Sequence, residues 1–423
     1  MKITLLFLTV FITSYLLHID PAYAGDTLTW EECICEAKEN HPDLISAAER
    51  VKQAKRDIEI DLSSILPQVN SSASGKRGRA STAKTRNTYT YGVTGEQLVF
   101  DGFKTSSEVS NSFKIMKAVE YTYAVTSSNI RLNLRSAFTE LLKAQELITL
   151  TEDIVNRRKQ NLELVRLRFN AGREHKGSLL TAEADLAQAE FEAAQAERNM
   201  SIVQRELTKE LGRSVKKEIK AEGNFSLGVD YGAAADFERL ADETPFLKEL
   251  IARKEAARYN LLSKESDFFP QVYLNASAGK TSKSFLPKNE EWSLGWAVSF
   301  PLFEGGSRIA EVSKAKSQYN QAKVDERSGR DSVLVTLESA WKNLQDGTAN
   351  VSVKNKFLEA AEERSKIASV QYEQGLISFD NWIIIENNLV DAKKEYLNAE
   401  ADMLINEAYW IQAIGGTLDY DKH

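Results

Sequence analysis

A heptad pattern of apolar residues over residues 104–212 constrains the fold of this chain most strongly. Apolar side chains recur at steps of four and three, and an Asn-Ala-Gly break at residues 170–172 interrupts them before the period resumes. Ten of the twelve seam positions before the break are apolar: Ile130, Leu134, Ala137, Leu141, Ala144, Ile148, Thr151, Val155, Arg158, Leu162, Val165 and Phe169. This period is typical of helices that pack along a seam. The segment is predicted to form two long antiparallel helices.

The same hairpin occurs a second time. A shift of 203 residues carries the first seam onto a second hairpin over residues 307–414, and it carries Leu211-Gly212 onto Ile414-Gly415. Self-similarity at a fixed offset indicates an internal duplication. We therefore expect a first repeat over residues 25–213, a linker over 214–235, a second repeat over 236–416 and a tail over 417–423.

Residues 1–24 have the pattern of a cleavable export signal. Lys2 precedes an apolar run over residues 3–17, and Pro21 and an Ala-Tyr-Ala sequence follow it before Gly25. No later window approaches the ~20 apolar residues that a membrane helix requires. If the exported chain enters a membrane, it is predicted to do so without spanning helices.

The composition excludes several functional classes. A formal net charge of −7 disfavours nucleic acid as a partner. The four histidines lie far apart in the sequence, so their spacing predicts neither a metal site nor a catalytic triad, and we expect no cofactor and no enzyme activity. Cys33 and Cys35 would point apart on a helix, which favours semi-buried small residues over a functional pair.

Helices are expected at residues 28–66 and 237–269, and each ends at a Pro-Gln pair that opens a strand. Strands are predicted at residues 67–80, 88–100, 270–281 and 291–303, because polar and apolar residues alternate there. One face of the second and fourth strands is aromatic and apolar and is the predicted lipid-facing surface: Tyr89, Tyr91, Val93, Trp292, Leu294 and Trp296. The residues between them are mostly small or polar.

Two environments fit this alternation. A soluble hairpin packed on a core would show it, and so would a membrane barrel, whose strands need ~9–11 residues. The export signal and the long hairpins favour the barrel. Four strands cannot close a barrel, since about eight are needed and open edges are not tolerated in lipid. Several chains are therefore predicted to share one barrel.

These features together resemble the TolC-like outer membrane efflux proteins. The resemblance covers residues 28–418 and rests on Leu-Pro-Gln at 66–68, Phe-Pro-Gln at 269–271, Phe-Asp-Gly at 100–102, Phe-Glu-Gly-Gly at 303–306 and the turn sequence from Tyr372 to Asp380. It implies a mixed fold of membrane β-barrel and α-helical coiled-coil tunnel, with twelve strands completed by a homotrimer in outer membrane lipid. It also implies a periplasmic membrane-fusion adaptor and an inner membrane transporter as partners.

The resemblance also suggests two sites at the hairpin tips. Gly172, Gly375, Leu376 and Ser378 are the expected adaptor contact, for which a plain solvent-exposed turn is the alternative. Some members carry acidic residues where this chain has Asn381 and Ile384, and an arginine where it has Ile377. The expected pore constriction therefore consists of the nearby Asp380 and Glu386, which could instead belong to a solvated helix start.

The sequence thus predicts the passive exit duct of a tripartite efflux or type I secretion system. The alternative is a periplasmic coiled-coil adaptor or structural protein without a membrane barrel. Adaptors use one helical hairpin flanked by β domains, whereas this chain has two hairpins and little other β content, which favours the duct.

Overall fold

The computed structural model describes residues 26–79, 85–215, 217–227, 236–285 and 289–420. The predicted export signal lies outside them. The chain divides into two compact units. The tip unit comprises Met1–His41, Asn133–Asp230 and Gln345–Ala408, and the strand unit comprises Pro42–Leu132, Tyr231–Leu344 and Tyr409–His423.

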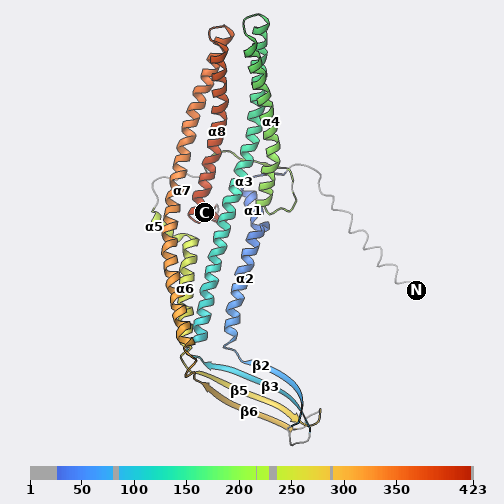
Figure 1. Ribbon diagram of the computed structural model, residues 1–423, viewed down its shortest axis with the longest axis vertical. Coiled ribbons are helices and arrows are strands. Elements are labelled where there is room, and N and C mark those ends of the chain that lie inside the picture. Colours follow the sequence, from blue (N-terminus) through green and yellow to red (C-terminus); the bar gives the residue numbers. More distant parts are fainter. Residues whose placement is uncertain (1–25, 80–84, 216, 228–235, 286–288, 421–423) are drawn as a thin grey trace, which may run out of the picture. The chain divides into compact units, whose positions relative to one another are not determined.

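The turn-side parts of two helical hairpins build most of the tip unit. The first joins α3 (Lys104–Asn170) to α4 (Lys176–Glu210), and the second joins α7 (Ser307–Glu373) to α8 (Phe379–Ala413). Both turns lie at the same end of the unit (Figure 1). The helices α3 and α7 have 67 residues each, and α4 and α8 have 35 each, so every boundary recurs at the offset seen in the sequence.

The tip unit also contains a small sheet that the sequence did not predict. Strand β1 (Asp26–Leu28) pairs in parallel with β4 (Ile219–Ala221), which lies within the predicted linker. The side chain of Gln145 on α3 accepts from Ala221 N at 2.8 Å and donates to Ala221 O at 3.0 Å, which covers the free edge of β4. Leu28 is therefore in a strand rather than a helix. Strands of three residues are too short to show alternation.

Helix α1 (Trp30–Asn40) begins at a capping box in which Thr29 and Glu32 satisfy each other's backbone N–H groups. On this helix Cys33 is buried and Cys35 is exposed, and both are free thiols. They point apart, as predicted, but the expectation that both are semi-buried is wrong.

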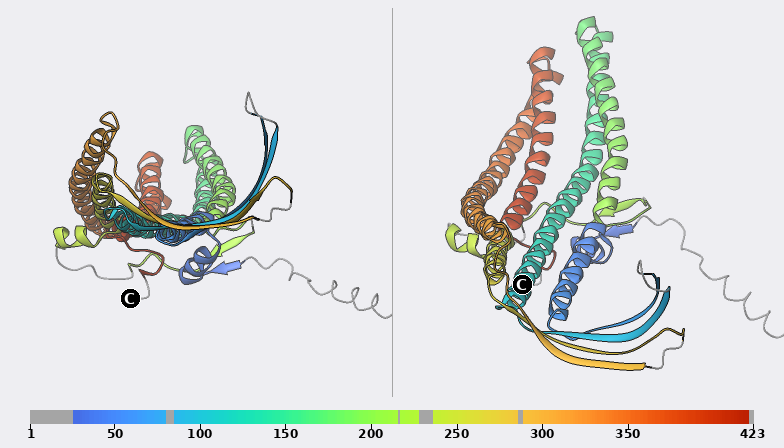
Figure 2. Two further views of the ribbon diagram at one scale, coloured as in Figure 1. Left: turned by 90° about the horizontal axis from the view of Figure 1, so that it is seen from below. Right: turned by 60° about the horizontal axis from the view of Figure 1, so that its bottom comes forward.

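The strand unit contains the helices α2 (Pro42–Ser63), α5 (Phe237–Glu243) and α6 (Pro245–Ser266), and one four-stranded sheet. The strands are β2 (Gln68–Gly78), β3 (Arg86–Phe100), β5 (Gln271–Ser282) and β6 (Asn289–Ser299), in the order β2-β3-β5-β6. All three pairings are antiparallel. The sheet is long and curved (Figure 2). Strands β3 and β5 come from different repeats, so the sheet joins the two halves of the chain.

The last strand is shorter than predicted. β6 ends at Ser299 rather than at residue 303. Pro301 follows and has no N–H to donate to a ladder, and Gly305 and Gly306 then take positive φ angles of 61° and 86° before α7 starts.

The strand register places the predicted lipid-facing residues on one face of the sheet. Val93 pairs with Ala278, which pairs with Trp292, and the neighbouring rows repeat this arrangement. We call this the aromatic face: Tyr89, Tyr91, Val93, Trp292, Leu294 and Trp296. Trp292 and Trp296 are 81% and 76% exposed. None of the described residues buries these two rings, and their contact with lipid stays a prediction.

Within the described ranges, no helix combines the length and the apolarity needed to cross a membrane.

Candidate functional site at the helical tips

Both hairpin turns end their first helix in the same way. Gly172 and Gly375 have φ angles of 68° and 79°, as the sequence predicted. Arg173 N donates to Arg168 O at 2.8 Å, and Leu376 N donates to Gln371 O at 2.7 Å, which are the bonds of a Schellman motif. Leu376 is exposed at the turn. Ser378 lies at the start of α8, where its Oγ accepts from Asn381 N.

An aromatic core lies directly behind the turns. Tyr372 stacks on Trp382 with ring centroids 4.3 Å apart and planes 9° apart, and Phe379 packs on both rings. The core includes residues of all four hairpin helices: Leu162, Val165, Ala182, Ala368, Tyr372, Phe379 and Trp382. Burial of this set joins the second hairpin to the first.

Tyr372 also belongs to a polar group that we call the Arg168 cluster, made of Arg168, Glu174, Ser178 and Tyr372. The Arg168 guanidinium lies 4.5 Å from the centre of the Tyr372 ring and donates to Tyr372 O at 2.6 Å. The Tyr372 hydroxyl donates to Glu174 Oε2 at 2.9 Å, and Ser178 Oγ donates to Glu174 Oε1 at 2.9 Å. This cluster connects the turn of the first hairpin to the end of α7.

Electrostatics strengthen these contacts. Burial acts to raise the pKa of Glu174, but hydrogen bonds from Tyr372 and Ser178 outweigh it and hold that pKa below its ordinary value. Burial and the hydrogen bond to Glu174 raise the pKa of Tyr372 well above its usual range. Tyr372 therefore stays protonated and remains a donor to an ionised carboxylate.

Deeper in the tip unit lies the Arg157 cluster, made of Arg157, Ser365 and Glu386. Arg157 Nε donates to Glu386 Oε2 at 2.6 Å, and its Nη2 donates to Glu386 Oε1 at 3.1 Å. Ser365 Oγ donates to Glu386 Oε1 at 2.6 Å, and Arg157 also contacts Ser365. The cluster thus binds α3 of the first hairpin to α7 and α8 of the second.

The Glu386 side chain is only 1% exposed, whereas that of Arg157 is 36% exposed. Burial acts to raise the pKa of Glu386, but hydrogen bonds from Arg157 and Ser365 outweigh it and lower the pKa. The carboxylate is ionised at neutral pH and depends on Arg157 for its charge balance. A buried charge with one compensating partner is sensitive to loss of that partner.

The structure separates the two acids that were expected to form one constriction. Asp380 is exposed in the first turn of α8, while Glu386 is buried beside Arg157. The Arg157 guanidinium offsets the charge of Glu386, and the place of Glu386 in the pore constriction stays a prediction. The carboxylates of Asp380 and Glu386 are not brought together as a pair of free acids.

Sequence reasoning did not assign Arg157, Arg168 or Glu174 to a site. One signal was present, because the apolar seams are interrupted by polar residues at Arg158 and Ser365. Ser365 is fully buried in the Arg157 cluster, and Arg158 is buried and contacts Asn387 beside it. Polar residues inside a heptad seam indicate a buried polar layer that specifies how helices pair. Among the described residues, no group of three metal-ligating side chains comes together.

The chain belongs to the outer membrane efflux protein family, whose model matches residues 33–213 and 238–416. It is an outer membrane protein by this membership, and the two matched segments each contain one helical hairpin.

The similarity to known proteins extends over nearly the whole chain. The outer membrane efflux protein BepC of Brucella suis is 23% identical, over 93% of this chain and 86% of the relative. The outer membrane protein TolC of Vibrio cholerae is also 23% identical, over 93% of this chain and 92% of the relative. The open-state structure of the MtrE outer membrane channel of Neisseria gonorrhoeae has a TM-score of 0.84 at 19% identity, over 93% of this chain and 90% of that one. The fold is therefore that of these channels.

Proposed function

We propose that three copies of this chain form a passive outer membrane duct with a periplasmic helical tunnel, which serves a tripartite efflux or type I secretion system. The observation that carries the proposal is the exposed aromatic face of a sheet with two open edges. The chain acts as a channel and does not catalyse a reaction.

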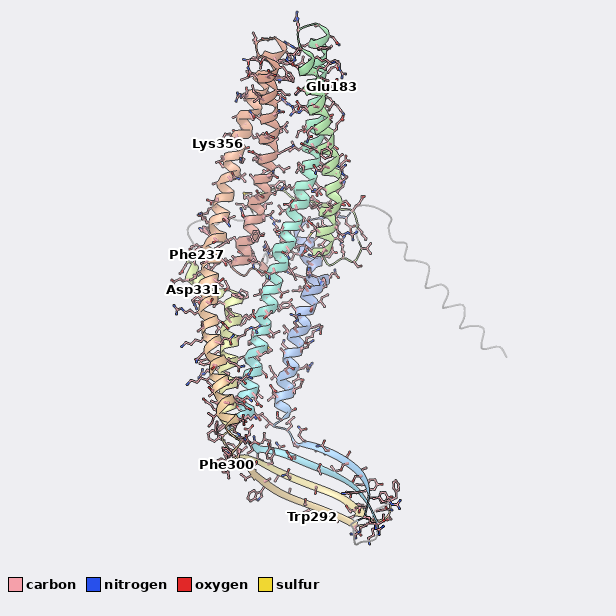
Figure 3. The ribbon with its side chains drawn as sticks, in the orientation of Figure 1. Glu183, Phe237, Trp292, Phe300, Asp331 and Lys356 are labelled. Carbon is pink, nitrogen blue, oxygen red and sulfur yellow. The ribbon has the colours of Figure 1, made fainter. Side chains whose placement is uncertain are left out.

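The dimensions of the sheet suit a bilayer. Strand β6 has 11 residues, which at ~3.3 Å each span about 36 Å, or about 25 Å across a membrane at a tilt of ~45°. Trp292 lies toward the end of β6 that is remote from the helices, and Phe300 lies at the helical end (Figure 3). Aromatic residues at both ends of an apolar band are typical of membrane strands.

The open edges require further copies of the chain. Among the residues that the structure describes, strands β2 and β6 each have one side without a partner strand. Unpaired backbone groups are not tolerated in lipid, so these edges would pair with neighbouring chains. Three copies give the twelve strands that the family resemblance implies.

The helices also have surface for neighbouring copies. Leu180, Phe191 and Ile202 follow one another on α4 at steps of eleven residues, about three helical turns, and each is more than half exposed. Exposed apolar side chains that recur on one face of a long helix are explained by contact with another helix. Self-assembly would cover it.

The two clusters at the tip would hold the duct closed. Both the Arg157 cluster and the Arg168 cluster join the second hairpin to the first, so separation of the hairpins breaks them. We place the adaptor contact at Gly172, Gly375, Leu376 and Ser378, which lie at the turns, and we place the constriction at the exposed Asp380. Glu386 then holds the closed state rather than lining the pore.

Mass measurement of the detergent-solubilised protein tests the assembly. Three chains per particle are expected, and a monomer that retains its β-structure would exclude the proposal.

The adaptor contact is tested in cells. Leu376→Arg should abolish export while the trimer and its membrane insertion persist. Glu363→Arg is the control, because Glu363 is an exposed residue on α7, away from the turn in which Leu376 lies. Equal export by Leu376→Arg and Glu363→Arg would remove the turn from the adaptor interface.

A further inference from the structure

A group of basic and aromatic side chains lies at the end of the sheet that is remote from the helices. On the aromatic face this end contains Arg77, Tyr89, Tyr91 and Lys280, with Phe285 in the turn after β5. Arg77 belongs to the face because it pairs with Asn87, two residues before Tyr89, and Lys280 belongs to it because it pairs with Tyr91.

The aromatic part of this group is ordered by its own contacts. The Phe285 ring meets Tyr89 and Tyr91 edge-on, with centroids 5.6 Å and 6.3 Å away, and the Tyr91 hydroxyl donates to Phe285 O at 3.1 Å. The Tyr89 ring lies over Gly75, since a Cβ there would be 3.2 Å from it. Phe285 and Tyr89 thus form an aromatic platform on the face that also carries Arg77 and Lys280.

A groove of about 890 Å³ crosses the strands beside this group, and Tyr91 and Lys280 of the group line it. Most of its lining side chains belong to the aromatic face, among them Ala73, Tyr91, Lys280 and Trp292. Lys280 Nζ lies 2.8 Å from Glu290 Oε1, and both side chains are largely exposed. The pair is therefore screened by solvent, and the ammonium keeps donors for another anion.

We propose that this rim binds the phosphorylated headgroup of an outer-leaflet glycolipid, with Arg77 and Lys280 as the phosphate ligands. The inference rests on the proposed function, which turns the aromatic face toward lipid. Arginine matches phosphate oxygens in a bidentate geometry, and lysine adds a point charge. A phosphate monoester carries up to two charges near neutral pH and therefore suits two cations. The aromatic platform lies where rings meet headgroups, and the groove accommodates the adjoining acyl chains.

The register supplies controls at the same level of the sheet. Lys76 pairs with Thr88, and Glu291 pairs with Gly279, so both side chains lie on the face opposite to Arg77 and Glu290. If the lipid binds on the aromatic face, substitution of Arg77 or Glu290 should change its affinity, and substitution of the sequence neighbours Lys76 and Glu291 should not. Non-specific attraction to the rim would not distinguish them.

The test measures binding of fluorescent bisphosphorylated lipid A to the detergent-solubilised protein, with dephosphorylated lipid A and inorganic phosphate as competitors. Arg77→Gln and Lys280→Gln should each weaken binding about fivefold, which corresponds to about 1 kcal/mol per cation at an anionic lipid surface, and about 25-fold together. Glu290→Gln should strengthen binding, because it releases Lys280. Lys76→Gln and Glu291→Gln should leave the affinity unchanged, and neither competitor should displace the lipid.

Equal losses in Arg77→Gln and Lys76→Gln, or wild-type affinity in the Arg77→Gln/Lys280→Gln protein, would overturn the lipid site. Displacement by inorganic phosphate would overturn it as well, since the site would then bind free anions. The mass of each protein is measured in the same samples. A trimer without charge-dependent binding refutes this inference alone, whereas a monomer refutes the proposed function and the lipid site together.

Discussion

Replacement of Arg157 by alanine should release the second hairpin from the first. The change leaves the Glu386 carboxylate, 1% exposed, with Ser365 and Asn161 as its remaining donors. Removal of one partner of a buried pair typically costs about 3–5 kcal/mol. Arg157 itself is 36% exposed, so water can replace part of the guanidinium, and we expect the lower end, about 3 kcal/mol.

Hydrogen–deuterium exchange of the α8 amides around Glu386 measures this opening in the assembled protein. A loss of about 3 kcal/mol corresponds to an increase in exchange rate on the order of a hundredfold, since each 1.4 kcal/mol is tenfold. Glu386→Gln should have a smaller effect, because a neutral amide tolerates burial better than an unpaired carboxylate and Arg157 can turn toward solvent.

Arg166→Ala is the matched control for this experiment. Arg166 lies further along α3 and pairs with Glu183 at 3.5 Å, with side chains 48% and 44% exposed. Figure 3 shows Glu183 toward the turn end of α4. An exposed pair contributes less than about 1 kcal/mol, so exchange should rise at most about fivefold. If Arg157→Ala and Arg166→Ala give the same exchange in α8, the Arg157 cluster does not hold the hairpins together.

Three further predictions concern pH, the Arg168 cluster and the sheet. Because the folded-state pKa of Glu386 is lowered, the contribution of Glu386 to closure is complete above the ordinary carboxyl pKa of ~4.3 and is lost as pH falls toward the folded value. Conductance in planar bilayers should therefore rise only in acid, and a rise between pH ~6 and ~8 would contradict this. Tyr372→Phe should lose the bond to Glu174 but keep its stacking, at about 1.5–3 kcal/mol in thermal unfolding, and an unchanged melting temperature would show that the bond is dispensable. If residue 296 lies near the bilayer midplane, Trp296→Arg should lower the free energy of unfolding in lipid by about 2–4 kcal/mol, whereas Ala297→Arg on the opposite face should lower it little. Equal losses in the two variants would invalidate the face assignment.

The regular elements were predictable because periodicity reports them directly. Heptad spacing predicted α3, α4, α7 and α8, and alternation predicted the four strands of the main sheet with small errors at their ends. Local chemistry explains the errors. Pro301 ends β6 early, and the strands β1 and β4 are held by tertiary pairing and by Gln145 rather than by any pattern within three residues.

The candidate site was only partly predictable. Gly172 and Gly375 follow from turn chemistry, since a positive φ angle is a local property. The role of Glu386 does not follow from the sequence, because its partner Arg157 is 229 residues away and belongs to the other hairpin. The sequence contains many acids and arginines that could pair, and only packing selects this pair.

The sequence by itself determined the long helices, the four strands of the main sheet and which face of that sheet is apolar, because each of these depends on residues three, four or two positions apart. The tertiary structure alone decided how the two hairpins are joined, and it made Glu386, which was expected at the constriction, the buried partner of Arg157. The physical reason is desolvation. The ionisation of a carboxylate at the surface depends on the charges near it in the sequence, whereas the ionisation of a buried carboxylate depends on the donor that the fold places beside it.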